Sequence, residues 1–147
     1  MLEQINKQPL VLVTGVFDLL HSEHLIFLNK AKALGSLIIA IESDERVREL
    51  KGFGRPINKQ AVRKHNLEKL GLACKILILP KKFSQSTNHR RLLQKIKPDI
   101  LAVSSHTPHL KEKASLMQEI GGRVEIVHQH NPAVSTTLVL KNQRKGW

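Results

Sequence analysis

The chain has 147 residues, of which 41% are hydrophobic and 24% charged, so it is long enough for one globular domain and too apolar for wholesale disorder. The formal net charge is +12, and the excess is uneven: residues 1–73 carry 11 basic and 8 acidic side chains, whereas residues 74–147 carry 13 and 4. A single cysteine, Cys74, excludes an internal disulfide and a zinc site built from several cysteines. The sequence also lacks a long apolar run, and we therefore expect a soluble, cytoplasmic protein without a membrane segment.

Short apolar runs alternate with longer segments of helical spacing, which is the pattern of strand–helix–strand units around a parallel sheet. Neighbouring residues in these runs are apolar in succession, as expected for strands covered on both faces. The predicted strands are Leu10–Thr14, Leu37–Glu42, Lys75–Leu79, Ile100–Ser104 and Arg123–Val127. Helices are predicted over 22–34, 44–50, 59–70, 86–97, 109–120 and 135–143. The predicted fold class is α/β, with one domain over residues 1–147 and an open parallel sheet of about five strands covered by helices on both faces.

A run of basic residues lies in the second half of the chain, where six lysines and arginines and no acid fall between Lys81 and Lys97. Such a run predicts either a solvated helix face or a surface that attracts phosphates and other anions. Binding of single-stranded RNA would require aromatic side chains for base stacking, and the chain has only four phenylalanines and one tryptophan. Nucleic acid is therefore an unlikely partner and remains a minor alternative.

The end of the first predicted strand carries the strongest chemical pattern. Thr14, Gly15, Val16 and Phe17 end this strand, and His21 and His24 follow in the first turn of the next helix. Backbone N–H groups and the positive end of a helix dipole gather at such a turn, which predicts a phosphate site. Two imidazoles there could stabilise negative charge on a phosphorus under attack. Packed or capping histidines, and a zinc site with Glu23 as a third ligand, are the alternatives.

Residues in this segment resemble a known signature. The pattern Gly15-x-Phe17-Asp18-x-x-His21-x-x-His24 is similar to the G-x-F-D-x-x-H-x-G-H motif of cytidylyltransferase-like nucleotidyltransferases. The resemblance continues through Glu42-Ser43-Asp44, Lys51-Gly52-x-Gly54-Arg55-Pro56 and Arg63 in the style of heptose-type adenylyltransferase domains, with glycerol-3-phosphate cytidylyltransferase as another similar member. It resumes at Val134-Ser135-Thr136-Thr137, which resembles a second signature, I-S-T-T. Nearly the whole chain is covered, and the resemblance implies a Rossmann-like fold.

The resemblance also implies a reaction, in which AMP or CMP moves from ATP or CTP to the phosphate of a small sugar- or polyol-phosphate acceptor with Mg²⁺ and release of pyrophosphate. By this analogy His21, His24, Lys51 and Arg63 are catalytic, and Asp44 and Arg55 bind the acceptor. The nucleotide would contact Thr14, Gly15, Val16, Phe17, Ser104, Ser135, Thr136 and Thr137. Asp18 is expected to be structural and bonded to backbone around the strand–helix turn. Because such enzymes are commonly dimers, a homodimer is also expected.

Two positions depart from the family pattern. Glu23 replaces the usual glycine and brings a carboxylate beside the predicted phosphate site. It either points away into solvent or repels the nucleotide unless Mg²⁺ or a lysine neutralises it. Ser104-Ser105-His106 replaces a glycine- and aspartate-rich segment, and His106 is either a contact to the base or ribose or an exposed loop residue. A non-catalytic nucleotide-binding relative is therefore an alternative. The loop Lys51–Asn58, with two glycines and two cations, is predicted to be mobile and close to the ligand.

Overall fold

A computed structural model describes residues 8–83 and 85–129 of the chain. Along this part, strands and helices alternate as the sequence predicts, and most bounds agree within one or two residues. The elements in chain order are β1 (Leu10–Gly15), α2 (Ser22–Lys32), β2 (Ser36–Ile41), α3 (Asp44–Lys51), α4 (Gln60–Lys69), β3 (Lys75–Ile78), α5 (Ser86–Ile96), β4 (Ile100–Ser104), α6 (Leu110–Glu119) and β5 (Arg123–His128). The helix predicted over 135–143 lies outside the described residues.

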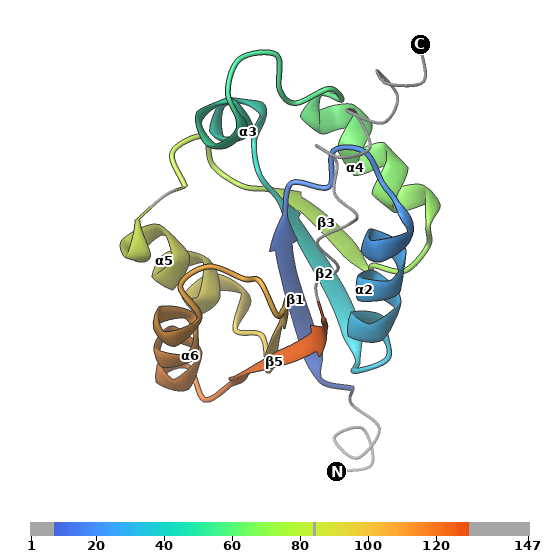
Figure 1. The fold of residues 1–147 in the computed structure, drawn as a ribbon. Coiled ribbons are helices and arrows are strands. Elements are labelled where there is room, and N and C mark those ends of the chain that lie inside the picture. Colours follow the sequence, from blue (N-terminus) through green and yellow to red (C-terminus); the bar gives the residue numbers. More distant parts are fainter. Residues whose placement is uncertain (1–7, 84, 130–147) are drawn as a thin grey trace.

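The five strands form one parallel sheet in the order β3-β2-β1-β4-β5 (Figure 1). Strand β1 is central. The chain continues through β2 and β3 on one side of it, and through β4 and β5 on the other. The order therefore reverses between β1 and β4, and in open α/β sheets ligands bind beyond the carboxyl ends of the strands at such a point. The α/β fold class and the Rossmann-like parallel sheet are confirmed.

Each face of the sheet carries its own apolar core. On one face, α2 and α4 pack against the sheet through buried residues that include Leu28 and Leu67. On the other face, α5 and α6 pack through residues that include Leu93 and Met117 (Figure 1). The strands are buried from both sides, which explains why they are apolar on successive residues.

The turn from α2 into β2 depends on a close backbone contact. The carbonyl of Pro9, just before β1, accepts a hydrogen bond from the N–H of Ser36 (2.9 Å). A Cβ on Gly35 would lie 2.1 Å from this carbonyl oxygen, so only glycine fits there without displacement. This contact fixes the start of β2 beside the start of β1.

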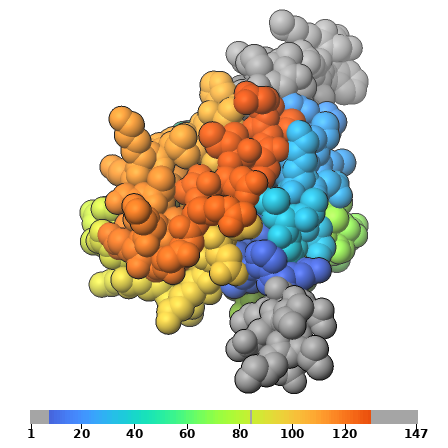
Figure 2. Space-filling model, turned by 90° about the horizontal axis from the view of Figure 1, so that it is seen from below, coloured from blue at the N-terminus to red at the C-terminus, as the bar shows by residue number. Residues whose placement is uncertain are grey.

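One strand pair contains an irregularity. Val103 of β4 aligns with Ile126 of β5, whereas Ser104 aligns with His128, so β5 has one extra residue at this point. Val127 packs against the core on the α2 side of the sheet. The extra residue allows His128, the next residue along, to face α2 as well. In Figure 2, the orange-red residues of β5 lie beside the blue residues of α2.

Within the described residues, no helix is both long and apolar enough to cross a membrane. The predicted run of basic residues includes much of α5, which packs on the sheet through one face. Its Arg90 forms an ion pair with Glu119 of α6 through two hydrogen bonds of 3.0 and 3.2 Å. At least this member of the run is therefore engaged on the protein surface.

Candidate active site

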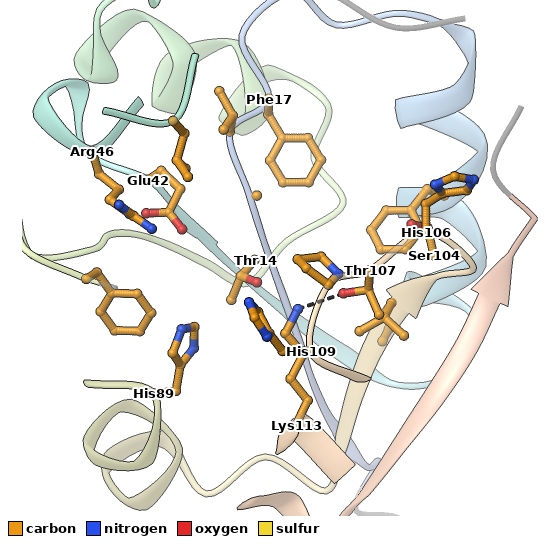
Figure 3. Close-up of a pocket in the computed structure, with 18 of the residues that line it drawn as sticks. Thr14, Phe17, Glu42, Arg46, His89, Ser104, His106, Thr107, His109 and Lys113 are labelled. Carbon is orange, nitrogen blue, oxygen red and sulfur yellow. Dashed lines mark hydrogen bonds between the residues drawn. The ribbon is translucent and has the colours of Figure 1, made fainter. Parts of the chain in front are cut away.

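A cavity of about 1150 Å³ opens at the carboxyl edge of the sheet (Figure 3). Its lining comes from the turn between β1 and α2, the ends of β2 and β4, and helices α3, α5 and α6. The cavity therefore lies at the reversal of strand order, where the topology predicts a ligand site. Nine of the predicted site residues line it, two of them cations of the Lys51–Asn58 loop: Thr14, Gly15, Val16, Phe17, His21, His24, Lys51, Arg55 and Ser104.

The two histidines of the first signature lie against each other. Their ring centroids are 3.8 Å apart with an interplanar angle of 21°. The backbone N–H of His21 donates to Nδ1 of His24 (3.3 Å), which orients the second ring. The ring of Phe17 meets His24 edge-on at 5.3 Å. A Cβ on Gly15 would lie 2.8 Å from the Phe17 ring, so the glycine of the signature makes room for the aromatic ring that supports His24.

The surroundings of His24 favour a neutral ring when no ligand is bound. Burial, followed by the charge of the neighbouring His21, lowers the pKa of His24 from 6.5 to about 4, although a hydrogen bond to the backbone of Leu19 opposes the change. His24 is therefore uncharged near neutral pH. A bound polyphosphate would favour the protonated ring, because opposite charge nearby stabilises the charged form.

Glu23, the departure from the family glycine, has partners on the chain. Its Oε1 lies 3.1 Å from Nε2 of His128 on β5, and Nδ1 of His128 lies 3.4 Å from Nζ of Lys30. The carboxylate still lines the cavity, but it is bonded to β5. Glu23 therefore contacts a histidine of β5, and Lys30 contacts that histidine and not the carboxylate. Neutralisation of Glu23 by Mg²⁺ or a lysine stays a prediction.

Asp18 is structural, as predicted, but its partners lie elsewhere. Its carboxylate accepts hydrogen bonds from the backbone N–H groups of Ile57 (2.7 Å) and Asn58 (2.8 Å) and from Nε of Arg55 (3.3 Å). The expectation that it binds backbone around its own strand–helix turn is therefore wrong. Asp18 instead fastens the second half of the Lys51–Asn58 loop beside the signature, while Phe53 in the first half is fully exposed.

Arg63 and Asp44 do not belong to the cavity lining formed by the described residues. Arg63 is fully buried, and its guanidinium donates to the carbonyls of Asn58, Val16 and Glu42 and to Oδ1 of Asp44 at 2.8 to 2.9 Å. The Asp44 carboxylate also accepts from the N–H of Gln60 (2.7 Å), and the Asp44 N–H donates back to the Gln60 side chain (3.0 Å). In the structure both side chains connect α3, α4 and the signature turn, and the predicted catalytic role of Arg63 and acceptor-binding role of Asp44 stay predictions.

Several polar side chains that line the cavity were not predicted as site residues, and four of them are titratable groups from different elements. Glu42 follows β2, Arg46 lies on α3, His89 on α5 and Lys113 on α6 (Figure 3). Burial raises the pKa of Glu42, and burial lowers the pKa values of His89 and Lys113. A sequence signal for Glu42 existed, because the residue after a parallel strand lies at the same edge as Gly15. The other three come from helices whose direction only the fold reveals.

The altered segment after β4 also reaches the cavity. Ser104, His106 and Thr107 line it, so His106 is placed where it can contact a ligand. The hydroxyl of Thr107 accepts a hydrogen bond from Nζ of Lys113 (2.6 Å). The second signature, with Ser135, Thr136 and Thr137, lies outside the described residues.

The described residues form no cluster of three or more histidine, cysteine or carboxylate side chains that could hold a metal ion. They therefore provide no protein cage for zinc. Mg²⁺ is commonly bound through substrate phosphates, water and one or two carboxylates. The carboxylate of Glu23, at the edge of the cavity beside the histidine pair, is compatible with that mode.

Nearly the whole chain is similar in sequence to known proteins. The protein named "Bifunctional protein HldE" from Geotalea uraniireducens is 34% identical over 146 residues, which are 98% of this chain and 29% of that protein. The protein of the same name from Shewanella amazonensis is 36% identical over 142 residues, which are 95% of this chain and 28% of that protein. The chain thus spans less than a third of the length of these relatives.

Solved structures share the fold. The lipopolysaccharide core biosynthesis protein from Thermoplasma volcanium matches with a TM-score of 0.66 and 23% identity, over 84% of this chain and 96% of that one. Pantoate-beta-alanine ligase from Francisella tularensis matches with a TM-score of 0.59 and 13% identity, over 93% and 69%. A family model described as cytidylyltransferase-like matches residues 12–143. The resemblance seen in the signature is therefore confirmed, and the chain belongs to the cytidylyltransferase-like family of nucleotidyltransferases.

Proposed function

We propose that the chain is a nucleotidyltransferase that moves AMP or CMP from ATP or CTP to the phosphate of a small sugar or polyol phosphate and releases pyrophosphate. The observation that carries this proposal is the stacked pair of His21 and His24 at the start of α2, inside the cavity at the reversal of strand order. A helix start with free backbone N–H groups binds phosphate, and the adjacent imidazoles supply further donors.

The arrangement suits an in-line attack on the α-phosphorus. An oxygen of the acceptor phosphate forms the new P–O bond, and the bond to the bridging oxygen breaks, so that pyrophosphate leaves with the electron pair. Negative charge on the oxygens of the α-phosphorus is stabilised by donors from His21, His24 and the first turn of α2. Lys51 and Arg55 line the same cavity and would counter the charge of the acceptor phosphate. When bound, Mg²⁺ supplies further neutralisation of the triphosphate.

The remaining predicted contacts belong to this proposal. Ser104 lines the cavity and would contact the nucleotide, while Ser135, Thr136 and Thr137 would hold its β- and γ-phosphates. For Arg63 and Asp44 we propose a positioning role through the hydrogen bonds that they make to the signature turn and to α4. A cytoplasmic location and a homodimer stay predictions.

Pyrophosphate release tests the function directly. The wild-type chain is assayed with each of four nucleoside triphosphates against phosphorylated sugars, polyols and amino alcohols. His21→Ala and His24→Ala are expected to abolish turnover while retaining cooperative unfolding. His65→Ala, on the exposed side of α4, is a matched control and is expected to keep the wild-type rate.

Two results would contradict the proposal. Unchanged rates in both histidine variants would remove the pair from the chemistry. Binding of ATP or CTP without pyrophosphate release with any acceptor would favour the alternative of a non-catalytic nucleotide-binding relative. The base that is preferred follows from the same screen, because each triphosphate is tested separately.

A further inference from the structure

The cavity is larger than one reactant requires. Pockets for single small ligands occupy roughly 300–1,000 Å³, and this one measures about 1150 Å³. The signature residues supply one part of its lining. Figure 3 shows another part, where Glu42 and Arg46 lie on one side of the cavity and His89 and Lys113 on the other. We call these four residues the distal set.

Two atoms of the distal set are buried without a hydrogen-bond partner among the described residues: Oε2 of Glu42 and Nε of Arg46. Buried polar atoms in folded proteins almost always have partners, so an acceptor and a donor left unsatisfied in a cavity point to a ligand that supplies both. A hydroxyl group does so, because it donates one hydrogen bond and accepts others. Two neighbouring hydroxyls could satisfy both atoms at once.

The charge balance of this part of the cavity indicates an uncharged body for the ligand. Arg46 and Lys113 both interact electrostatically with Glu42, and Arg46 also forms an ion pair with Glu49 of α3 (2.9 Å). Glu42 interacts electrostatically with Arg46, Arg63 and Lys113, so its carboxylate is already surrounded by positive charge. A ligand ammonium group placed beside Glu42 would be repelled by these cations.

An aromatic enclosure for a cationic ligand is also missing from the described part of the distal region. Phe83 is the aromatic side chain there, and its ring packs edge-on against His89 at 4.5 Å. Recognition of ammonium ligands typically uses several aromatic faces. The distal set is therefore better suited to hydroxyl groups than to an amino alcohol.

We propose that Glu42 and Arg46 determine acceptor specificity by binding two neighbouring hydroxyls on the body of the acceptor. The carboxylate of Glu42 accepts from one hydroxyl, and Nε of Arg46 donates to the oxygen of the next. Lys113, whose Nζ uses one donor on Thr107, has further N–H donors for the same ligand. This inference rests on the proposed function, since it assigns the acceptor's body to one part of the shared cavity.

The experiment compares pairs of acceptors that differ only in hydroxyls, such as glycerol 3-phosphate and propyl phosphate. Binding to the nucleotide-free chain is measured by calorimetry, and KM and kcat are measured with the preferred triphosphate. Glu42→Ala is expected to weaken binding of the hydroxylated acceptor roughly tenfold or more. Its effect on propyl phosphate and on the KM for the triphosphate is expected to be small.

Two further variants isolate the cause. Glu42→Gln keeps the shape and one acceptor oxygen, so it is expected to lose less affinity for the hydroxylated acceptor than Glu42→Ala. Glu45→Gln is the control: it also removes one negative charge, but Glu45 lies on α3 and does not line the cavity. Its affinity for both acceptors is expected to match that of the wild type.

The outcomes separate this inference from the proposed function. An equal loss of both acceptors in Glu42→Ala, with turnover intact in the wild type, would overturn the specificity role and leave the function standing. Tighter binding of phosphoethanolamine than of glycerol 3-phosphate to the wild type would also overturn it. If no acceptor supports pyrophosphate release but Glu42→Ala still selectively weakens the hydroxylated ligand, the function fails and the hydroxyl site stands.

Discussion

Replacing Arg63 by methionine should destabilise the fold far more than an ordinary surface substitution. The guanidinium is fully buried and donates four hydrogen bonds, three of them to backbone carbonyls and one to Asp44. Truncation leaves these acceptors without their donor, and breaking a buried ion pair costs about 3–5 kcal/mol. Asp44 keeps 29% of its side chain exposed, so water can partly replace the lost donor there. We therefore expect a loss of about 3 kcal/mol in the free energy of unfolding.

Urea unfolding followed by circular dichroism measures this loss. With a slope of about 1–3 kcal/mol per molar urea, the midpoint should fall by at least about 1 M. Arg48→Met, at an exposed position of α3, is the matched control and should leave the midpoint within a few tenths of a molar. Arg63→Lys should recover only part of the loss, because an ammonium cannot serve four acceptors in the fixed geometry of a guanidinium.

Activity alone cannot distinguish the two roles of Arg63. A catalytic arginine and an arginine that positions Val16 would both lower turnover when replaced. Stability does distinguish them, since a side chain that faces the reactants contributes little to folding. Loss of turnover in Arg63→Met with a midpoint equal to that of the wild type would refute the scaffold role.

Three further predictions concern other parts of the molecule. The pKa of His24 is about 4 in the folded chain and 6.5 for an unperturbed histidine, so the unfolded chain binds the proton first as the pH falls. The free energy of unfolding should therefore fall by up to about 3 kcal/mol between about pH 6.5 and 4. Urea midpoints measured across this range should depend less on pH in His24→Asn, and an identical dependence would contradict the assignment. Gly35→Ala should lower the melting temperature by several degrees, because its Cβ would clash with the Pro9 carbonyl. A melting temperature equal to that of the wild type would show that the turn can shift to accommodate the methyl group. Glu23→Gly should lower the free energy of unfolding by about 1 kcal/mol, because the His128 contact and the helix propensity of glutamate are lost. The same change should tighten triphosphate binding, and a higher Kd for the triphosphate would contradict repulsion by this carboxylate.

The order and type of the described elements could be predicted from sequence because each strand is apolar on successive residues and each helix is closed by recognisable turn residues. The extended run at Leu37–Glu42 is an example: its bounds differ from those of β2 by a single residue at each end. The signature at the end of β1 likewise placed the histidine pair at a cavity. Both results follow from local patterns, in which the decisive residues are near neighbours in the chain.

The sequence could not predict the surroundings of residues whose partners come from distant parts of the chain. Arg63 follows a glycine-rich loop and resembles a cation that faces ligand, but the sequence cannot show that three carbonyls surround it. Asp18 has its partners about forty residues away, at Ile57 and Asn58. The distal set was missed for the same reason, because Glu42 and Lys113 share a cavity only once β2 and α6 are placed around the sheet.

The extra residue in β5 has a consequence for how the site can be perturbed from outside. By turning His128 toward α2, it ties the outermost strand to Glu23, which stands between the two histidines. A strand that contributes none of the signature residues thereby helps to set the tilt of the helix that does. A fused tag or a bound antibody that displaces β5 should therefore change activity at the histidine pair before it lowers the stability of the core.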